Sequence, residues 1–466
     1  MTEKPADSKL LTDIDRFICA HEDRIVKDIA RLVAIPSVAG TPEPGAPYGS
    51  APKQGLDCAL TIARELGLKT VNCADRIGYA VVGEDRDDGY LATITHTDVV
   101  PAGSGWPADP FILREQDGYL LGRGVLDDKG PSVLCLYALK YLLDAGLTLR
   151  YPVRALLGSS EETGMDDIQY YLANYPVPLF CISPDADFPL INGEKGIYHA
   201  NLVSRHSPDR VRCISGGVAV NAVAAEATAL VKAETLSDSR TVHVSPVENG
   251  VWKLSATGMS AHASTPEGSV NAIGLLVDYL LENDIPSPDE LPYFRFLQKL
   301  HRSTDGSGLG LQSADGRFSP LTAVGGKITT EDGVITQTID CRYGTAISGA
   351  EITSRLQADA DGAAEVLVES DLVPFYIEPD HPAILACLDS YRLVTGEVAA
   401  PVTIGGGTYA RHFPLAAAFG PGHPERIRPA FCGTIHGVNE AVSRSEMMEA
   451  LKIYILSLIR LEELVF

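Results

Sequence analysis

The stretch Val153-Arg154-Ala155-Leu156-Leu157-Gly158-Ser159-Ser160-Glu161-Glu162-Thr163-Gly164 places two neighbouring acids shortly after an apolar run. The run itself is typical of a buried strand. Two adjacent carboxylates at the end of such a strand leave water and repel each other, which would raise their pKa values. A bound cation removes this difficulty, because a metal can take one carboxylate while the other stands beside it as a base. Alone, the acidic pair is more commonly a solvated turn, so the metal hypothesis depends on the rest of the chain.

Length and composition predict a globular protein of more than one domain. The chain has 466 residues, of which 45% are hydrophobic and 21% charged. A chain of this length exceeds one ordinary core, so two or three domains are expected. It has no apolar run of about 18 residues, the length that a membrane helix needs. The formal charge of −23 argues against nucleic acid or an anionic membrane as a partner.

The cysteines and the N-terminal sequence favour a cytoplasmic location. The nine cysteines are scattered, include no CxxC pair, and lie in several cases within apolar runs. They are therefore expected to be reduced core residues. Residues 1–7 are polar and lead into an amphipathic helical pattern, which differs from a secretory signal.

The order of the expected elements indicates an α/β fold. Strands at 69–82, 90–95, 153–158 and 179–183 alternate with helices at 55–66, 131–145 and 166–173, after a first helix over 8–34. This alternation is typical of a doubly wound, mainly parallel sheet, which binds ligands beyond the carboxyl ends of its strands. The candidate side chains that follow expected strands are His96, Glu161, Glu162 and Asp185.

Residues 196–378 have a different pattern and predict an inserted α+β domain. Strand-like alternation is mixed there with expected helices at 222–232, 270–281 and 350–358. After residue 378 the helix, strand and helix pattern returns and ends in a long helix from about Ser443. The first domain would therefore comprise 1–195 and 379–466, with the insert between them.

A wider set of histidines and acids turns the acidic pair into a metal hypothesis. His96-Thr97-Asp98 puts its histidine and aspartate on one face of an extended segment, so Asp98 could fix the tautomer of His96. The set that could hold metal is His96, Asp127, Glu162, Asp185 and His436. Two histidines and three carboxylates suit two divalent ions, zinc first and manganese next. A shared carboxylate would hold such ions about 3.5–4 Å apart.

Short motifs along the chain carry a family resemblance. They are His96-Thr97-Asp98-Val99-Val100-Pro101, Gly122-Arg123-Gly124 through Asp127-Asp128-Lys129-Gly130-Pro131, Ser160-Glu161-Glu162-Thr163-Gly164, Ser183-Pro184-Asp185-Ala186-Asp187, Asn192-Gly193-Glu194-Lys195-Gly196, Ser260-Ala261-His262, Gly406-Gly407-Thr408-Tyr409-Ala410-Arg411 and His436-Gly437-Val438-Asn439-Glu440. With these motifs in this order, the chain resembles the M20 family of metallopeptidases and amidohydrolases. Within that family it is most similar to the PepV-like (Sapep-type) dipeptidases.

The resemblance implies how the metal ligands are shared. Asp127 would bridge the metals, and a cis peptide bond would join it to Asp128. His96 and Asp185 would bind one metal, and Glu162 and His436 the other.

The resemblance also implies the remaining roles. Asp98 would support His96, and Glu161 would be the general base that takes a proton from a water between the metals. The insert would be a lid, on which His262 stabilises the oxyanion. Asn221 and Arg411 would contact the substrate.

Substrate and assembly follow as further expectations. In the family, an aspartate at the position of Asp185 goes with enzymes that need a free α-amine, and Arg411 suits a terminal carboxylate. The predicted substrate is therefore a dipeptide or short peptide. The alternative is a deacylase of N-acyl amino acids such as acetylornithine or succinyl-diaminopimelate. A catalytically inactive relative would be expected to lack the base or a ligand, yet all are present. The enlarged insert predicts a monomer.

Overall fold

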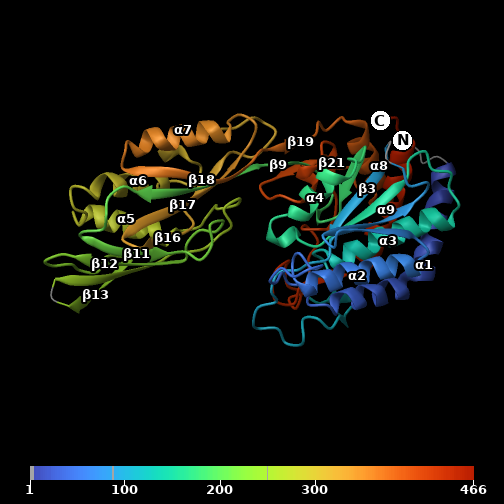
Figure 1. The fold of residues 1–466 in the computed structure, drawn as a ribbon, viewed down its shortest axis with the longest axis horizontal. Coiled ribbons are helices and arrows are strands. Elements are labelled where there is room, and N and C mark those ends of the chain that lie inside the picture. The colour runs from blue at the N-terminus through green and yellow to red at the C-terminus, as the bar shows by residue number, and fades with distance from the viewer. Residues whose placement is uncertain (1–4, 87–88, 249) are drawn as a thin grey trace. The chain divides into compact units, whose positions relative to one another are not determined.

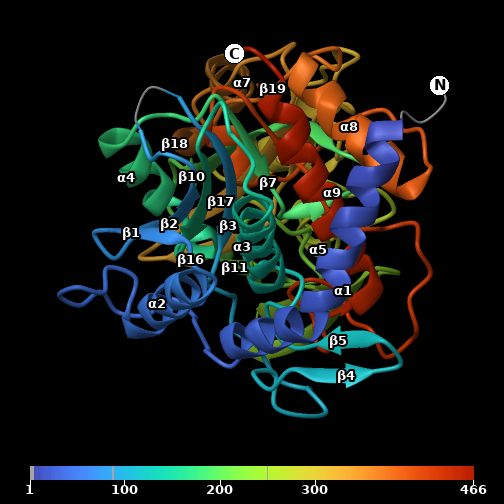
Figure 2. The ribbon, with the colours of Figure 1, turned by 90° about the vertical axis from the view of Figure 1, so that its right-hand side faces the viewer.

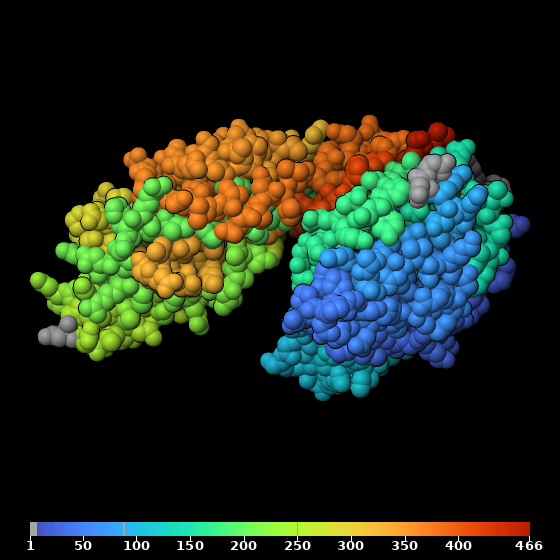
Figure 3. Space-filling model, in the orientation of Figure 1, coloured from blue at the N-terminus to red at the C-terminus, as the bar shows by residue number. Residues whose placement is uncertain are grey.

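The computed structural model describes residues 5–86, 89–248 and 250–466, and the chain divides into two compact units. The core unit comprises Met1–Asn192, Tyr376–Val402 and Gly407–Phe466. The insert unit comprises Gly193–Phe375 and Thr403–Gly406. Figure 3 shows that residues from both ends of the chain, blue and red, contribute to the core unit. Residues 1–4, part of the expected polar N-terminus, lie outside the described residues.

A mixed sheet with a parallel centre organises the core unit. Its strands run in the order β1 (Lys69–Cys73), β2 (Ile77–Val82), β6 (Val153–Gly158), β3 (Leu91–His96), β7 (Phe180–Ser183), β21 (Ala416–Ala418) and β9 (Ile191–Glu194). The central strands β6, β3, β7 and β21 are parallel, whereas β1, β2 and β9 pair antiparallel with their neighbours. The prediction of a mainly parallel α/β sheet is confirmed, with antiparallel strands at its edges.

Helices cover both faces of this sheet. The core-unit helices are α1 (Pro5–Val33), α2 (Ser50–Glu65), α3 (Lys129–Asp144), α4 (Asp166–Asn174), α8 (Pro382–Thr395) and α9 (Arg444–Glu462). Figure 2 shows α4 on one side of the strands and α3 and α9 on the other. Because two faces are covered, β2, β3 and β6 are buried along their whole length. This explains why their sequences are apolar runs rather than alternating patterns.

The boundaries of the core-unit helices agree with the sequence patterns except at α2. That helix begins at Ser50, five residues before the expected start at residue 55, and Pro52 lies in its first turn. Proline is tolerated in the first turn of a helix, where its missing N–H would have no partner inside the helix. The C-terminal helix begins where expected, and the Ser443 side chain caps it by accepting from the backbone N–H of Glu446.

Short elements connect the core unit. They are β4 (Arg114–Gln116), β5 (Tyr119–Leu121), β8 (Ala186–Asp187), β19 (Phe375–Tyr376), β20 (Val402–Ile404), β22 (Pro421–Gly422), β23 (Ala441–Ser443), η1 (Glu161–Thr163) and η3 (Tyr409–His412). Strands β23, β5 and β4 form a small antiparallel sheet. This sheet flanks two loops considered below, because the turn at 122–128 leaves β5 and the loop at 433–440 enters β23.

The insert unit is an antiparallel sheet with three helices. Its strands lie in the order β13 (Val242–Glu248), β14 (Val251–Thr257), β12 (Glu226–Lys232), β11 (Val211–Gly216), β16 (Ile328–Glu331), β17 (Val334–Tyr343), β10 (Gly196–Ser204) and β18 (Ala364–Leu372), and β15 (Thr322–Val324) pairs with β17. The helices are α5 (Ala272–Glu282), α6 (Leu291–His301) and α7 (Gly349–Ala360), with a short turn η2 (Ser307–Leu309). Figure 1 shows these helices beside the sheet, and the two layers share one buried cluster.

The prediction of a helix at 222–232 is wrong, because residues 226–232 form strand β12. The alanines there favour a helix on propensity. However, Ala227, Ala229 and Val231 are buried and alternate with more exposed residues, which is the period of a strand. Packing between β11 and β14 therefore outweighs helix propensity.

The structure also bears on the expectations about membrane helices and cysteines. Among the described residues, no helix combines the length and the apolarity that a bilayer span requires. All nine cysteines are free thiols, and four of them, Cys73, Cys135, Cys181 and Cys387, are buried in the core unit.

The strand assignment of β12 predicts opposite results for two neighbouring substitutions. Ala229→Asp would bury an unpaired charge and should lower the free energy of unfolding by about 3 kcal/mol or more. Thr228→Asp points to the other face of the sheet and should cost less than about 1 kcal/mol. Denaturant unfolding of the intact protein measures both, and a more damaging Thr228→Asp would contradict the assignment.

Candidate metal centre

The carboxyl ends of adjacent parallel strands bring the predicted ligands to one edge of the core-unit sheet. His96 is the last residue of β3, where it lies opposite Gly158 of β6. Glu161 and Glu162 lie on η1 shortly after β6, and Asp185 follows β7. Since β6, β3 and β7 are neighbours, their ends meet at the same edge, as such sheets require.

Asp127 lies between two histidines and faces one with each carboxylate oxygen. His96 Nε2 is 2.9 Å from Asp127 Oδ1, and His436 Nε2 is 2.9 Å from Asp127 Oδ2. Glu162 Oε1 lies 3.2 Å from His436 Nε2, on that side. Asp185 Oδ2 lies 3.8 Å from His96 Nε2, on the other. The structure thus brings all five predicted ligands together, divided around one shared carboxylate.

Burial raises the pKa values of some of the carboxyl groups in this cluster. The His96 side chain is 0% exposed, and those of Asp127 and Glu162 are each 9% exposed. Burial, together with the charge of Asp127, raises the pKa of Asp185 to about 7. Burial also raises the pKa of Glu161 well above its ordinary value, and Asp185 and Glu162 add to the effect.

The pKa values of the two histidines are raised as well, which favours the charged form of each ring. Hydrogen bonds to Asp127 and Glu162 raise the pKa of His436 to about 10. Burial alone would lower the pKa of His96, but contacts with Asp127 and Asp98 outweigh it and raise the value. The positive charges of the imidazolium rings therefore offset the negative charges of the carboxylates. A bound metal cation could fill the same role.

The donor set fits divalent cations. Ligand atoms of His96, Asp127 and Glu162 lie within 4.8 Å of one another, and so do those of His96, Asp128 and Asp185. Imidazole nitrogen and carboxylate oxygen are the donors of zinc and manganese sites. His96 Nδ1 contacts the backbone oxygen of Asp98 at 3.0 Å. This contact orients the ring so that Nε2, the other ring nitrogen, faces the cluster.

The Asp98 carboxylate contacts more than the histidine it was expected to support. Its Oδ1 is 3.4 Å from His96 Nδ1. The same carboxylate accepts the backbone N–H groups of Glu161 at 3.3 Å and Glu162 at 3.1 Å. Asp98 therefore links the end of β3 to the turn that carries both glutamates.

A second buried carboxylate holds the same turn from its other side. Asp167 accepts the backbone N–H groups of Ser159 at 2.7 Å and Ser160 at 3.0 Å, and the hydroxyl of Tyr409 at 2.6 Å. Gly158 leaves room for this contact, because a Cβ there would collide with the Tyr409 hydroxyl. The segment before Glu161 is thus fixed by Asp167, which in turn is held by Tyr409 from a distant part of the chain.

Arg411 lies in the core unit on η3, two residues after Tyr409. A side chain at Gly407 would collide with its guanidinium, so the glycine turn makes space for the arginine. Burial and the nearby Arg411 lower the pKa of His412 to about 4, so this neighbour stays neutral.

The insert unit brings its two predicted residues, Asn221 and His262, together. Ala222 pairs with His262 in an isolated bridge, and Ala263 N–H donates to the Asn221 carbonyl at 2.9 Å. The backbone N–H of Ser264 donates to His262 Nδ1 at 3.2 Å, so the proton of the neutral ring lies on Nε2. Partial burial and Arg342 lower the pKa of His262, which favours this neutral form.

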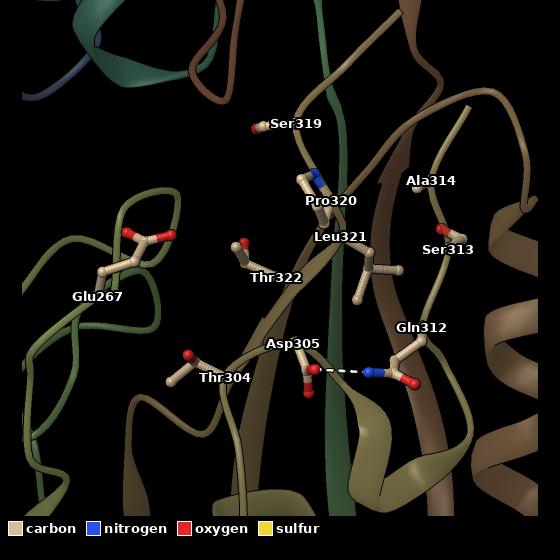
Figure 4. Close-up of a pocket in the computed structure, with 10 residues that line it drawn as sticks. All are labelled: Glu267, Thr304, Asp305, Gln312, Ser313, Ala314, Ser319, Pro320, Leu321 and Thr322. Carbon is tan, nitrogen blue, oxygen red and sulfur yellow. Dashed lines mark hydrogen bonds between the residues drawn. The ribbon is translucent and has the colours of Figure 1, made fainter. Parts of the chain in front are cut away.

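A pocket of about 580 Å³ lies in the insert unit (Figure 4). Thr322, one of its lining residues, donates to the carbonyl of Ala263, next to His262. The Asp305 carboxylate is engaged by Ser303, Ser307 and Gln312. The residues that line the pocket include no predicted site residue. Asp305, the more buried of its two acids, makes hydrogen bonds within its own loop.

Sequence reasoning missed several residues around the centre. From the sequence, Asp128 was named only as the cis partner of Asp127, yet its carboxylate lies in the second candidate ligand group and accepts the backbone N–H of His96 at 3.1 Å. Asp167, Arg123 and Glu440 contact backbone groups of the ligand-bearing loops, and Tyr409 donates to Asp167. The motifs contain three of these four, but a motif does not reveal a backbone partner.

The expected peptide geometry is present at the bridging residue. The bond between Asp127 and Asp128 is cis, as the family resemblance implies. A family model described as Peptidase family M20/M25/M40 matches residues 92–460, which includes every predicted site residue. The chain belongs to this family. It is therefore an M20 metallopeptidase, and the resemblance stated from the motifs is confirmed.

Curated relatives and solved structures agree with the M20 assignment. The chain is 29% identical to the Bacillus subtilis protein named "Putative dipeptidase YtjP", over 94% of this chain and 97% of that one. It is also 29% identical to "Putative dipeptidase SSP1012" of Staphylococcus saprophyticus, over 95% and 97%. The fold is similar to human carnosine dipeptidase 1, with a TM-score of 0.60, 15% identity, and coverage of 98% and 99%.

A dinuclear relative shows the same fold. The chain matches YXEP of Bacillus subtilis, described as a dinuclear metal binding peptidase of the M20 family, with a TM-score of 0.53 and 9% identity over 95% of this chain and 98% of that one. At this identity the likeness concerns the fold alone.

The cluster predicts that one histidine controls metal content. His436→Ala should lower the amount of bound metal per chain, because Asp127 and Glu162 lose their neighbour on that side. Elemental analysis after dialysis measures this. His243→Ala, at an exposed histidine of the insert unit, is the control and should leave metal content unchanged. A His436→Ala protein with wild-type metal content would contradict the assignment.

Proposed function

We propose that this M20 metallopeptidase is a two-metal dipeptidase. The observation that carries the proposal is the Asp127 carboxylate, whose two oxygens each face a different histidine at 2.9 Å. That division provides one ligand group with His96 and Asp185 and another with His436 and Glu162. Zinc is our first assignment and manganese the second.

The bound ions would acidify a water molecule and polarise the substrate carbonyl. The chain supplies the proton transfer. Glu161 precedes the proposed ligand Glu162 on η1, and burial raises its pKa, with the charges of Asp185 and Glu162 adding to the effect. A carboxylate of raised pKa can accept the proton of the attacking water and return it to the leaving amine. Glu161 is therefore the proposed general base.

Three further residues would contact the substrate. His262 Nε2 carries the ring proton and can donate to the oxygen of the tetrahedral intermediate, which assigns the insert unit the role of a lid. Asn221 lies on the segment paired with that of His262 and is the proposed companion contact. The guanidinium of Arg411 offers two parallel N–H donors to a terminal carboxylate.

The proposed substrate is a dipeptide or short peptide with a free amino end. Support comes from the relatives named as dipeptidases and from Asp185, because an aspartate at this position goes in the family with enzymes that need a free α-amine. N-acyl amino acids also carry a carboxylate, so Arg411 alone would not separate the two substrate classes. The amino end decides between peptidase and deacylase.

The base assignment predicts a separation between turnover and metal content. Glu161→Gln should keep both metals and lower kcat by about 10²–10⁴-fold, because an amide keeps the shape but cannot carry the proton. Glu162→Gln is the matched comparison and should lower metal content instead. Kinetics and elemental analysis of the same preparations test this, and substantial activity of Glu161→Gln at full metal occupancy would exclude Glu161 as the base.

The substrate assignment predicts a strict need for both peptide ends. Wild-type enzyme should cleave dipeptides and fail on their N-acetylated forms. Arg411→Ala should cost ~2–5 kcal/mol in kcat/KM, the cost of leaving a buried charge without its partner. Arg392→Ala, which removes a surface ion pair with Asp389, should change little. Faster turnover of N-acetyl amino acids than of dipeptides would replace the peptidase by the deacylase.

A further inference from the structure

The carboxylate of Glu440 is saturated with donors from the turn that carries Asp127. Its Oε1 accepts the backbone N–H groups of Leu126 at 3.0 Å and Asp127 at 3.2 Å. Its Oε2 accepts the backbone N–H of Gly124 at 3.0 Å and the guanidinium of Arg123 at 2.7 Å. Glu440 is 0% exposed, so these contacts replace its hydration completely.

Arg123 extends this connection to the second histidine. While one of its terminal nitrogens contacts Glu440, the other donates to the backbone carbonyl of His436 at 2.9 Å. The side chains of Arg123 and Glu440 are each 1% exposed. The guanidinium also lies 5.4 Å from the centre of the Trp106 ring. We call this buried pair the Arg123–Glu440 clamp.

His436 depends on such support more than His96 does. His96 belongs to β3, which is buried between two parallel neighbours. His436 lies on a loop, its side chain is 52% exposed, and its backbone has a positive φ of 61°. A non-glycine residue in this conformation is held by its surroundings. The clamp joins that loop to the turn of Asp127, the ligand that His436 contacts.

We propose that Arg123 and Glu440 are positioning residues that set the spacing of Asp127 and His436 and thereby the affinity for the second metal. The inference rests on the proposed two-metal centre. The ion whose affinity the clamp would set is the divalent ion bound by Asp127, Glu162 and His436. The ion beside His96 and Asp185 depends on the clamp only through Asp127.

An isosteric change isolates the clamp. In Glu440→Gln, one side-chain oxygen becomes an NH₂ group. Each oxygen of Glu440 faces two N–H donors, so either orientation of the amide places donors against donors. The loop therefore loses its fixed position without a change in side-chain volume.

A matched ion pair controls for general loss of stability. Arg154 contacts Asp85 at 2.7 Å and its side chain is 2% exposed. It lies at the start of β6, at the end of the sheet opposite to Gly158 and the metal ligands. Asp85→Asn should therefore lower the melting temperature and leave metal binding unchanged.

The test is calorimetric titration of zinc into metal-free full-length protein, for wild type, Glu440→Gln, Arg123→Lys and Asp85→Asn. The clamp variants should bind one of the two zinc equivalents about 10–100-fold more weakly, with a smaller change in the other. Lysine keeps the charge but cannot reach both Glu440 and the His436 carbonyl, so Arg123→Lys decides if Glu440→Gln does not fold.

The possible outcomes separate two claims. Wild-type affinities for both equivalents in a folded clamp variant would overturn the proposed positioning role. A weakening of the same size in Asp85→Asn would also overturn it, because the effect would then be general destabilisation. Binding of fewer than two zinc ions by the wild type would instead overturn the two-metal function itself.

Discussion

The structure depends on the burial of several carboxylates at one edge of a sheet. Ionised carboxylates that are buried close together are stable only when cations lie among them. Without a metal, burial raises the pKa of Asp185 to about 7. The Asp127 carboxylate meets this constraint because each of its oxygens contacts a histidine. The parallel centre of the core-unit sheet makes the arrangement possible, because neighbouring strands end together.

A common device holds the loops around this edge. Three buried carboxylates outside the five-residue ligand set each accept two or more backbone N–H groups from segments that carry the ligands. Asp98 holds the turn of the two glutamates, Asp167 holds the residues before that turn, and Glu440 holds the turn of Asp127. A carboxylate that accepts several N–H groups fixes a loop without a long helix or strand. The precision of the centre therefore comes from acids that are not its ligands.

The sheet and the candidate ligands could be predicted from the sequence because both leave local signals. Apolar runs followed by histidine or acid marked the ends of β3 and β6, and the structure brings those residues together. Strand β12 was mistaken for a helix because its alanines satisfy helix propensity, and only its pairing partners decide otherwise. The role of Glu440 could not be predicted because three of its four hydrogen-bond donors are backbone groups more than 300 residues away, and backbone groups carry no sequence signal.

The central claim is a pair of metals that share Asp127. Anomalous diffraction from crystals grown with zinc, collected on both sides of the zinc absorption edge, tests it most directly. The account predicts two peaks about 3.5–4 Å apart, with Asp127 between them, His96 and Asp185 at one peak, and His436 and Glu162 at the other. A single peak, or two peaks of which neither contacts Asp127, would contradict it.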